Sequence, residues 1–389
     1  MKLASEAACR YNQPRSAMQR PFVATLTLAI CAAVLVACGA NGDSNPSPTL
    51  LPAPTSGGGS RGFEMGLSSL PAELTQESYE SAFELAGRAG DLVLIQRTPP
   101  WEEMISGELS DATINATERE TTLADEQGLD LFVAIDPTEE IEGQSEIAAL
   151  PDRLRGAGFD NPEIQGAFIA YAQYVAENYQ PKYLALGVEI NSYQIQHQDD
   201  FERFVILYHR AYEAVKQLSP ETLVFPTFQY EELQGLLPLT DPRPPQWNLL
   251  SRFEPRIDLL AISSYPSLLY RDPQVIPESY YAQLTSHTSR PIAIAGLGFA
   301  SDVAPAEAGA TAGEANQASF LRKVLDNAQQ LHVRFVVWFV GQDPSFSTDA
   351  TFEDFRHTGL LNEDGTPKRA WSDWAAEATR AIATPEPGP

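Results

Sequence analysis

The sequence lacks cysteine almost everywhere. Its three cysteines, Cys9, Cys31 and Cys38, all lie near the N-terminus. The rest of the chain therefore cannot hold a disulfide framework, a thiolate zinc site or a cysteine nucleophile. The five histidines include no pair with the HExxH spacing of a helical zinc site. We expect neither a metal nor a cofactor.

Positive charge is also scarce. The chain has 26 lysine and arginine residues against 52 aspartate and glutamate residues, so its formal net charge is -26. Such a surface repels phosphate backbones and anionic lipid surfaces at long range, which excludes nucleic acid as an expected partner. The same charge is ordinary for a soluble surface outside the cytoplasm, so it does not identify a ligand.

One apolar run stands out, at residues 22–37, where it follows three arginines. It is too short and too rich in small residues for a membrane span, and it is typical of a signal peptide. The run ends in Leu35-Val36-Ala37-Cys38, which resembles the bacterial lipobox, in which the cysteine is acylated. Residues 1–38 are therefore predicted to be a lipoprotein signal peptide with Cys38 as the lipidation site. The alternative is an ordinary secretory signal with a chance cysteine.

Two further segments have a composition that cannot form a core. Residues 39–62 are dominated by Ser, Pro, Gly and Thr, so they bury too little apolar surface to fold and are predicted to be a flexible tether. Residues 381–389 have the same character and are predicted to be a flexible tail. The folded domain is expected to span residues 63–380, a normal size for one barrel.

Apolar runs bounded by turn residues alternate with amphipathic segments along this domain. Strands are predicted at residues 63–68, 92–96, 131–135, 183–188, 222–226, 259–263, 291–295 and 334–339. Helices are predicted at residues 77–89, 117–126, 162–178, 200–218, 278–286 and 315–330. Eight such units favour a parallel sheet closed into a single-domain (β/α)8 TIM barrel of the α/β class. An open doubly wound sheet is the alternative, which the lack of GxGxxG after the first strand weakens.

A glutamate follows the fourth predicted strand, in Gly187-Val188-Glu189-Ile190-Asn191. Functional groups of such barrels lie just after the strands, at the carboxyl-terminal face. A glutamate there can be the general acid of glycoside hydrolysis, because the leaving sugar oxygen needs a proton from a carboxyl group whose pKa is raised by its pocket. Glu189 is therefore the candidate catalytic residue. The alternative is a glutamate paired with a basic neighbour at the rim.

Several segments of this chain resemble segments of one group of barrel enzymes, and they come in the same order along the chain. They are residues 63–69 at the first strand, 181–187 before Glu189, 262–266 at the sixth strand, 336–339 at the eighth strand, and 359–371. With these segments the folded region resembles the clan A glycoside hydrolases, nearest in pattern to the family 53 endo-β-1,4-galactanases. The resemblance implies a carbohydrate-active barrel in which Tyr265 contacts the nucleophile and Trp338 forms the floor of a sugar subsite.

Two positions depart from the pattern of that clan. Asn usually stands directly before the acid/base glutamate, whereas this chain has Val188. The seventh predicted strand is similar to the nucleophile strand, but Gly296 stands where the glutamate belongs. A retaining mechanism needs two carboxyl groups about 5–5.5 Å apart. The resemblance therefore implies a degenerate nucleophile position, which puts catalytic competence in question.

Inverting hydrolysis stays open, because it needs carboxyl groups about 6.5–9.5 Å apart with a water molecule between them. The candidate bases are Asp136, Glu231, Glu232, Asp302 and Asp343. The sequence does not distinguish among them.

Aromatic faces at a barrel mouth can stack on the apolar faces of sugar rings. The candidate substrate-binding residues are Trp101, Arg97, Asn191, Tyr193, Tyr230, Tyr265 and Trp338. Arg97 resembles an arginine that many clan members keep beside the nucleophile. The alternatives are loop packing for the aromatic residues and a salt bridge at the rim for Arg97.

Three hypotheses follow. The first is a cell-surface lipoprotein whose catalytically degenerate, glycoside hydrolase-like barrel binds a poly- or oligosaccharide. The second is an active glycosidase, inverting or atypical, with Glu189 as general acid. The third is a non-catalytic scaffold, since a fold alone does not fix a function. The chain is expected to be a monomer outside the cytoplasm, lipid-anchored to a bacterial membrane through Cys38.

Overall fold

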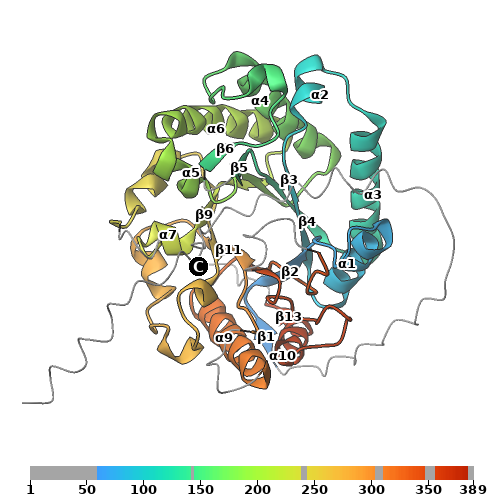
Figure 1. The fold of residues 1–389 in the computed structure, drawn as a ribbon, viewed down its shortest axis with the longest axis vertical. Helices are drawn as coiled ribbons and strands as arrows, with labels where there is room; N and C mark the ends of the chain where they lie inside the picture. The colour runs from blue at the N-terminus through green and yellow to red at the C-terminus, as the bar shows by residue number, and fades with distance from the viewer. Residues whose placement is uncertain (1–58, 142–143, 238–242, 303–309, 347–354, 384–389) are drawn as a thin grey trace, which may run out of the picture.

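The structure is a computed structural model that describes residues 59–141, 144–237, 243–302, 310–346 and 355–383. The predicted signal peptide, most of the predicted tether and the end of the predicted tail lie outside these residues. A ring of helices surrounds a parallel sheet (Figure 1).

The sheet contains nine strand segments, and every neighbouring pair is parallel. The segments are β2 (Glu64–Ser68), β3 (Leu92–Arg97), β4 (Asp130–Ile135), β7 (Tyr183–Leu186), β8 (Leu223–Phe225), β9 (Thr227–Gln229), β10 (Leu260–Ser264), β11 (Ile292–Leu297) and β12 (Phe335–Trp338). Their order is β8-β7-β4-β3-β2-β12-β11-β10-β9. A single residue, Pro226, separates β8 from β9. Proline lacks the N–H that a strand needs for hydrogen bonding, so it interrupts the strand here. The two ends of the sheet are thus one divided strand, and the predicted (β/α)8 barrel is confirmed.

The helices of the described residues lie outside the sheet (Figure 1). They are α1 (Gln76–Arg88), α2 (Trp101–Ser106), α3 (Asp111–Gln127), α4 (Pro162–Asn178), α5 (Ile190–Gln196), α6 (Gln198–Leu218), α7 (Tyr230–Leu233), α8 (Leu250–Phe253), α9 (Ala310–Gln330) and α10 (Arg369–Ala378). The prediction for 162–178 matches α4, which Asn161 caps. In the described part of the chain, no helix is both long and apolar enough to cross a membrane.

The helix predicted at 278–286 is wrong in type and length. This segment contains only a 3-10 helix, η6 (Ala282–Ser286). Neighbouring residues of an α-helix point about 100° apart. Here Tyr280 and Tyr281 are both buried, and both hydroxyls join the hydrogen-bond network around Ser264. That shared inward direction explains why the segment is not a regular helix.

The lower part of the barrel interior is filled by aromatic rings. Phe132, Tyr183, Phe225 and Phe335 come from β4, β7, β8 and β12, and their ring centroids lie 4.5 to 6.4 Å apart. Successive residues of a strand point to opposite faces, so every second residue of these strands faces the barrel axis. The rings close the barrel below the strand ends, and any open site has to lie above them.

The two ends of the described chain meet at the amino-terminal face of the barrel. β1 (Ser60–Arg61) pairs in parallel with β13 (Ala381–Ile382), just outside the predicted domain of residues 63–380. Arg61 is buried, and its guanidinium group donates to Asp91 Oδ1 at 2.7 Å, directly before β3. The chain therefore enters the barrel at the face opposite the carboxyl ends of the strands.

The turn that follows β7 depends on a glycine. Gly187 has a φ of 114°, and a Cβ atom at this position would lie 2.8 Å from Phe204 Cζ. We expect Gly187→Ala to lower the free energy of unfolding by more than about 2 kcal/mol, because alanine meets both backbone strain and a clash. Urea denaturation of the variant and the parent measures this change in the free energy of unfolding. Gly166→Ala on α4, where a Cβ meets no atom within 4 Å, is the control and should stabilise by about 0.5–1 kcal/mol. Equal effects of the two substitutions would contradict this account.

Candidate functional site

A small cavity lies at the carboxyl ends of the strands, above the aromatic rings. Its polar lining consists of Gln96, Glu189, Thr227, Ser263 and Tyr265, and Gly296 and Phe339 also line it. The cavity has ≈ 20 Å³ of space for the centre of a water-sized molecule. A buried water needs roughly 10–15 Å³ of such space. The cavity therefore admits a water molecule or one small functional group, and not a sugar ring.

The backbone after β7 brings Glu189 into this cavity. Glu189 has a φ of 47°, a left-handed conformation that is unusual for a residue with a side chain. Its N–H donates to Thr227 Oγ1 at 2.8 Å, which ties the end of β7 to β9. The residue is 5% exposed. Such strained residues cluster at functional sites, because the surrounding structure has to hold them in place.

The surroundings of Glu189 favour its protonated form. Burial is the largest cause that raises the pKa of Glu189; the nearby acids Glu232, Asp136 and Glu231 raise it as well, a hydrogen bond with Ser263 lowers it, and the net pKa is about 8. No lysine or arginine among the described residues forms a salt bridge with it, so the alternative of a rim ion pair does not hold. At neutral pH the carboxyl group is mostly a neutral hydrogen-bond donor.

Gly296 lines the same cavity from β11. The register of β10 against β11 shifts here, so that Ser263 pairs with Gly296. A Cβ atom at Gly296 would lie 2.8 Å from the Tyr265 hydroxyl oxygen and 3.3 Å from Ser263 Oγ. These two groups fill the space in which any side chain at position 296 would begin. The cavity thus has one acidic residue in its lining, Glu189.

Glu231 lies close by but is fully engaged. Its two carboxyl oxygens accept hydrogen bonds from Gln229 Nε2, Ser264 Oγ and Tyr280 OH, each at 2.7 Å, and from the Tyr265 N–H at 3.2 Å. The side chain is fully buried, and burial raises its pKa. A carboxylate with both oxygens saturated and no solvent access cannot activate a water molecule, so Glu231 is a structural acid that holds the start of the loop after β10.

The other candidate bases are also engaged or distant. Asp136 is buried, accepts from Gln96 Nε2 at 2.8 Å and has a pKa raised well above its ordinary value by burial. Glu232 accepts a hydrogen bond from Ser192 Oγ. Asp343 pairs with the buried Lys368, and Asp302 is exposed in the loop after β11. None of these four lines the cavity.

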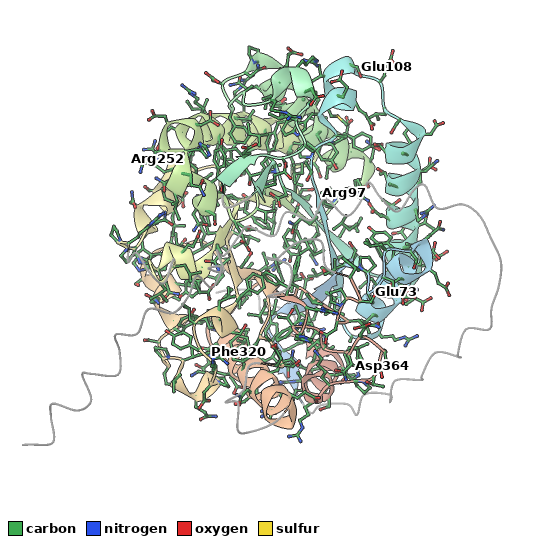
Figure 2. All side chains as sticks on the ribbon, viewed as in Figure 1. Glu73, Arg97, Glu108, Arg252, Phe320 and Asp364 are labelled. Carbon is green, nitrogen blue, oxygen red and sulfur yellow. The ribbon has the colours of Figure 1, made fainter. Side chains whose placement is uncertain are left out.

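Arg97 does not lie beside the cavity, contrary to the expectation from the resemblance. Its side chain pairs with Glu120 on α3, which also accepts a hydrogen bond from Tyr179 OH at 2.7 Å. The alternation of β3 explains this position, because Gln96 lines the cavity and the next residue must point outward. Figure 2 labels Arg97 at the end of β3. The salt-bridge alternative is the one that the structure supports.

Trp338 is likewise on the outer side of its strand. It is fully buried, its Nε1 donates to Thr358 O at 2.8 Å, and its ring packs against Trp374 of α10 and Phe320 of α9. A ring enclosed between sheet and helices cannot stack on a sugar. The next residue, Phe339, is the one that lines the cavity. The expected floor of a sugar subsite at Trp338 is therefore incorrect.

Four more candidates belong to the packing of the loops. Trp101 is buried and donates to Ala148 O at 2.6 Å, and Tyr193 OH donates to Asp200 Oδ2 at 2.8 Å. The buried Tyr230 donates to Tyr280 O, and Asn191 exchanges hydrogen bonds with the backbone of Gln229. Of the seven predicted substrate-binding residues, only Tyr265 lines the cavity.

The sequence did not single out Gln96, Thr227, Ser263 and Phe339 as site residues, although all four line the cavity. Each faces the cavity from its own strand or from the residue directly after it. The signal that could have found them is the two-residue period of the strands, counted from the buried aromatic layer upward. In the part of the chain that the structure describes, no group of three or more His, Cys, Asp or Glu residues is arranged to hold a metal ion.

Comparison with known proteins finds solved structures with a similar barrel. No protein-family model and no curated protein match the chain. Solved structures match. The exo-beta-1,4-mannosidase Op5Man5 from Opitutaceae bacterium strain TAV5 is 16% identical, with a TM-score of 0.61 and 86% of this chain covered. The chain spans 63% of the length of that mannosidase.

Two further solved structures are similar. A GH5_18 protein from Bifidobacterium longum subsp. infantis is 17% identical, with a TM-score of 0.60, and the match covers 83% of this chain and 80% of that one. Xylanase 10B from Thermotoga maritima is 12% identical, with a TM-score of 0.57, over 82% of this chain and 94% of the xylanase. The chain has a glycoside hydrolase-like fold. At these identities the likeness extends to the fold alone.

The raised pKa of Glu189 predicts how stability depends on pH. The folded state binds this proton more tightly than the unfolded state, so the free energy of unfolding falls as pH rises from the ordinary value of 4.5 to about 8. Glu189→Gln removes the titration. We expect the variant to be more stable than the parent by about 4 kcal/mol at pH 8, with little difference at pH 4.5.

Thermal unfolding of both proteins across this pH range is the measurement. Asp326→Asn, an exposed substitution on α9, is the matched control and should leave the parent's pH profile unchanged. A stability difference between Glu189→Gln and the parent that is the same at both pH values would show that the carboxyl group is not held protonated.

Proposed function

We propose that the protein is an extracytoplasmic, lipid-anchored glycan-binding protein whose glycoside hydrolase-like barrel does not hydrolyse its ligand. One observation carries this proposal. The cavity at the mouth contains a single acidic side chain, Glu189, and the Tyr265 hydroxyl fills the space next to Gly296. Glycoside hydrolysis uses two carboxyl groups, of which one attacks or activates water. A barrel with one such group lacks half of that chemistry.

The carbohydrate ligand is supported by the fold and by the chemistry of the mouth. The solved structures with a similar fold include an exo-beta-1,4-mannosidase and a xylanase. Hydroxyl groups of Ser263 and Tyr265 and the carboxyl group of Glu189 converge on one small space. Convergent polar groups at the carboxyl face of a barrel are the arrangement in which this fold binds small polar ligands. A sugar ring would lie above the cavity with one substituent inside it.

The second candidate function is an active glycosidase with Glu189 as general acid. It is favoured by the pKa of Glu189, which burial raises to about 8, because an acid catalyst must carry its proton at neutral pH. The candidate still needs a base. The acids that raise the pKa of Glu189, namely Glu232, Asp136 and Glu231, are engaged in hydrogen bonds within the protein.

A panel of β-galactan, β-mannan, xylan and β-glucan tests the two functions together. We expect binding of at least one glycan, measured by affinity electrophoresis, with no reducing-sugar release above that of Glu189→Gln. Release that falls by about 10²-fold or more in Glu189→Gln would favour the glycosidase instead. If the protein neither binds nor cleaves any glycan of a broad array, the scaffold hypothesis replaces both.

The anchor is supported by the lipobox-like segment that ends at Cys38 and by the course of the chain. Residues 60–61 join the barrel at its amino-terminal face, where β1 pairs with β13. Glu189 and the cavity lie at the opposite face, where the strands end. A lipid at Cys38 would therefore hold the barrel by the end away from the site and leave the mouth open to large glycans.

Lipidation is testable by a single substitution. Cys38→Ala in the full chain should shift the protein from the detergent phase to the aqueous phase of a Triton X-114 partition, because one acylated residue carries the membrane affinity. Cys31→Ala, seven residues earlier in the same apolar run, is the matched control and should stay in the detergent phase. Detergent partition that persists in Cys38→Ala would contradict lipidation at this residue.

A further inference from the structure

The Tyr265 hydroxyl is a polar group without a partner at the centre of the site. Tyr265 is 5% exposed, and its hydroxyl oxygen forms no hydrogen bond among the described residues. It lies in the lining of the cavity, beside Ser263 and across from the backbone of Gly296. Polar groups inside proteins are normally paired, so an unpaired hydroxyl directed into a cavity is available to pair with water or with a ligand atom there. The ligand atom has to be small, because the cavity has ≈ 20 Å³ of space for its centre.

The ionisable groups that act most strongly on Glu189 are all acids. Three acids act on Glu189: Asp136 follows β4, while Glu231 and Glu232 belong to α7. Opposite charges attract strongly where water is excluded, and like charges repel. This site therefore disfavours a carboxylate or sulfate of a ligand and favours a positive group.

We propose that the cavity takes a primary ammonium group, and that the glycan bound at the mouth is one with free amino groups, such as a chain of glucosamine units. This inference rests on the proposed glycan-binding function and names its ligand class. An ammonium group is about the size of a water molecule and has three N–H donors. The lining offers it at least three acceptors: the Glu189 carboxylate, Ser263 Oγ and the Tyr265 hydroxyl oxygen. An N-acetyl group is too large for the same space.

Binding is coupled to a proton. The free site holds Glu189 in its protonated form, since burial raises its pKa to about 8. A bound ammonium places a positive charge beside the carboxyl group and stabilises the carboxylate. Glu189 then gives its proton to solvent, while the ammonium keeps all three of its own. Each binding event at pH 7 releases close to one proton.

Three tetrasaccharides with the same β-1,4 backbone isolate the amine: the glucosamine oligomer, its N-acetylated form and cellotetraose, which carries a hydroxyl group instead. Isothermal titration calorimetry of the full protein is done at pH 7 in two buffers of different ionisation enthalpy. The glucosamine oligomer should bind at least about tenfold more tightly than the other two, as expected for charge-assisted hydrogen bonds. The difference between its apparent binding enthalpies in the two buffers, divided by the difference in buffer ionisation enthalpy, should correspond to the release of close to one proton.

Variants separate the cavity from the overall negative charge. Glu189→Gln should abolish both the amine preference and the proton release, and Tyr265→Phe should weaken amine binding by about 3- to 10-fold. Asp326→Asn, an acid on the outer face of α9, should change neither. Circular dichroism confirms that each variant is folded before its binding is compared.

Each other outcome overturns the inference in its own way. Equal affinity for the three tetrasaccharides would remove the ammonium site and leave the proposed glycan-binding function in place. An amine preference that survives in Glu189→Gln would assign it to the charge of the whole surface. No binding of any tetrasaccharide, together with no binding in the wider glycan panel, would remove the proposed function as well.

Discussion

The alternation of side chains along the barrel strands is the constraint on which the site depends. Each strand sends every second residue toward the axis, and the aromatic layer of Phe132, Tyr183, Phe225 and Phe335 fixes which residues those are. Above that layer the inward positions end in Gln96, Ser263 and Phe339, and these line the cavity. Their outward neighbours meet the helices, as Arg97, labelled in Figure 2, does through its ion pair with Glu120 of α3. Phe132 of the aromatic layer also lines the cavity, so the layer forms its base.

Much of the architecture could be predicted from the sequence, because strand and helix periods are local properties. All eight predicted strands occur, and α4 begins at Pro162 because Asn161 and Pro162 are strong start signals. The residues of the site were harder to predict from the sequence. Glu189 was found because it follows a strand directly, whereas Trp338 was misjudged because closeness to a strand end does not tell on which face a residue lies. That face follows from register and from the bulge in β11, which only the assembled sheet reveals.

The electrostatics of the mouth follow from burial more than from net charge. Glu231 is buried like Glu189, but its carboxyl group accepts four hydrogen bonds that replace those it would form with water. The donors are Gln229, Ser264, Tyr265 and Tyr280. Glu189 lacks such a shell, since its side chain has the hydrogen bond with Ser263 and otherwise faces the cavity. A buried carboxyl group with few donors stays protonated, because ionisation in a dry site is costly. The two glutamates thus differ in chemistry although they are close in space.

The same reasoning decides what a second carboxyl group at position 296 would require. A side chain there would begin 2.8 Å from the Tyr265 hydroxyl, and the Tyr265 N–H is fixed by Glu231. Phe355 packs edge-on against the Tyr265 ring at 4.7 Å, so the ring has little freedom to retreat. Close-packed interiors resist such shifts. The absence of a carboxyl group from β11 is therefore built into the packing of the neighbouring strand and loop, and restoring a glutamate would mean moving Tyr265 as well.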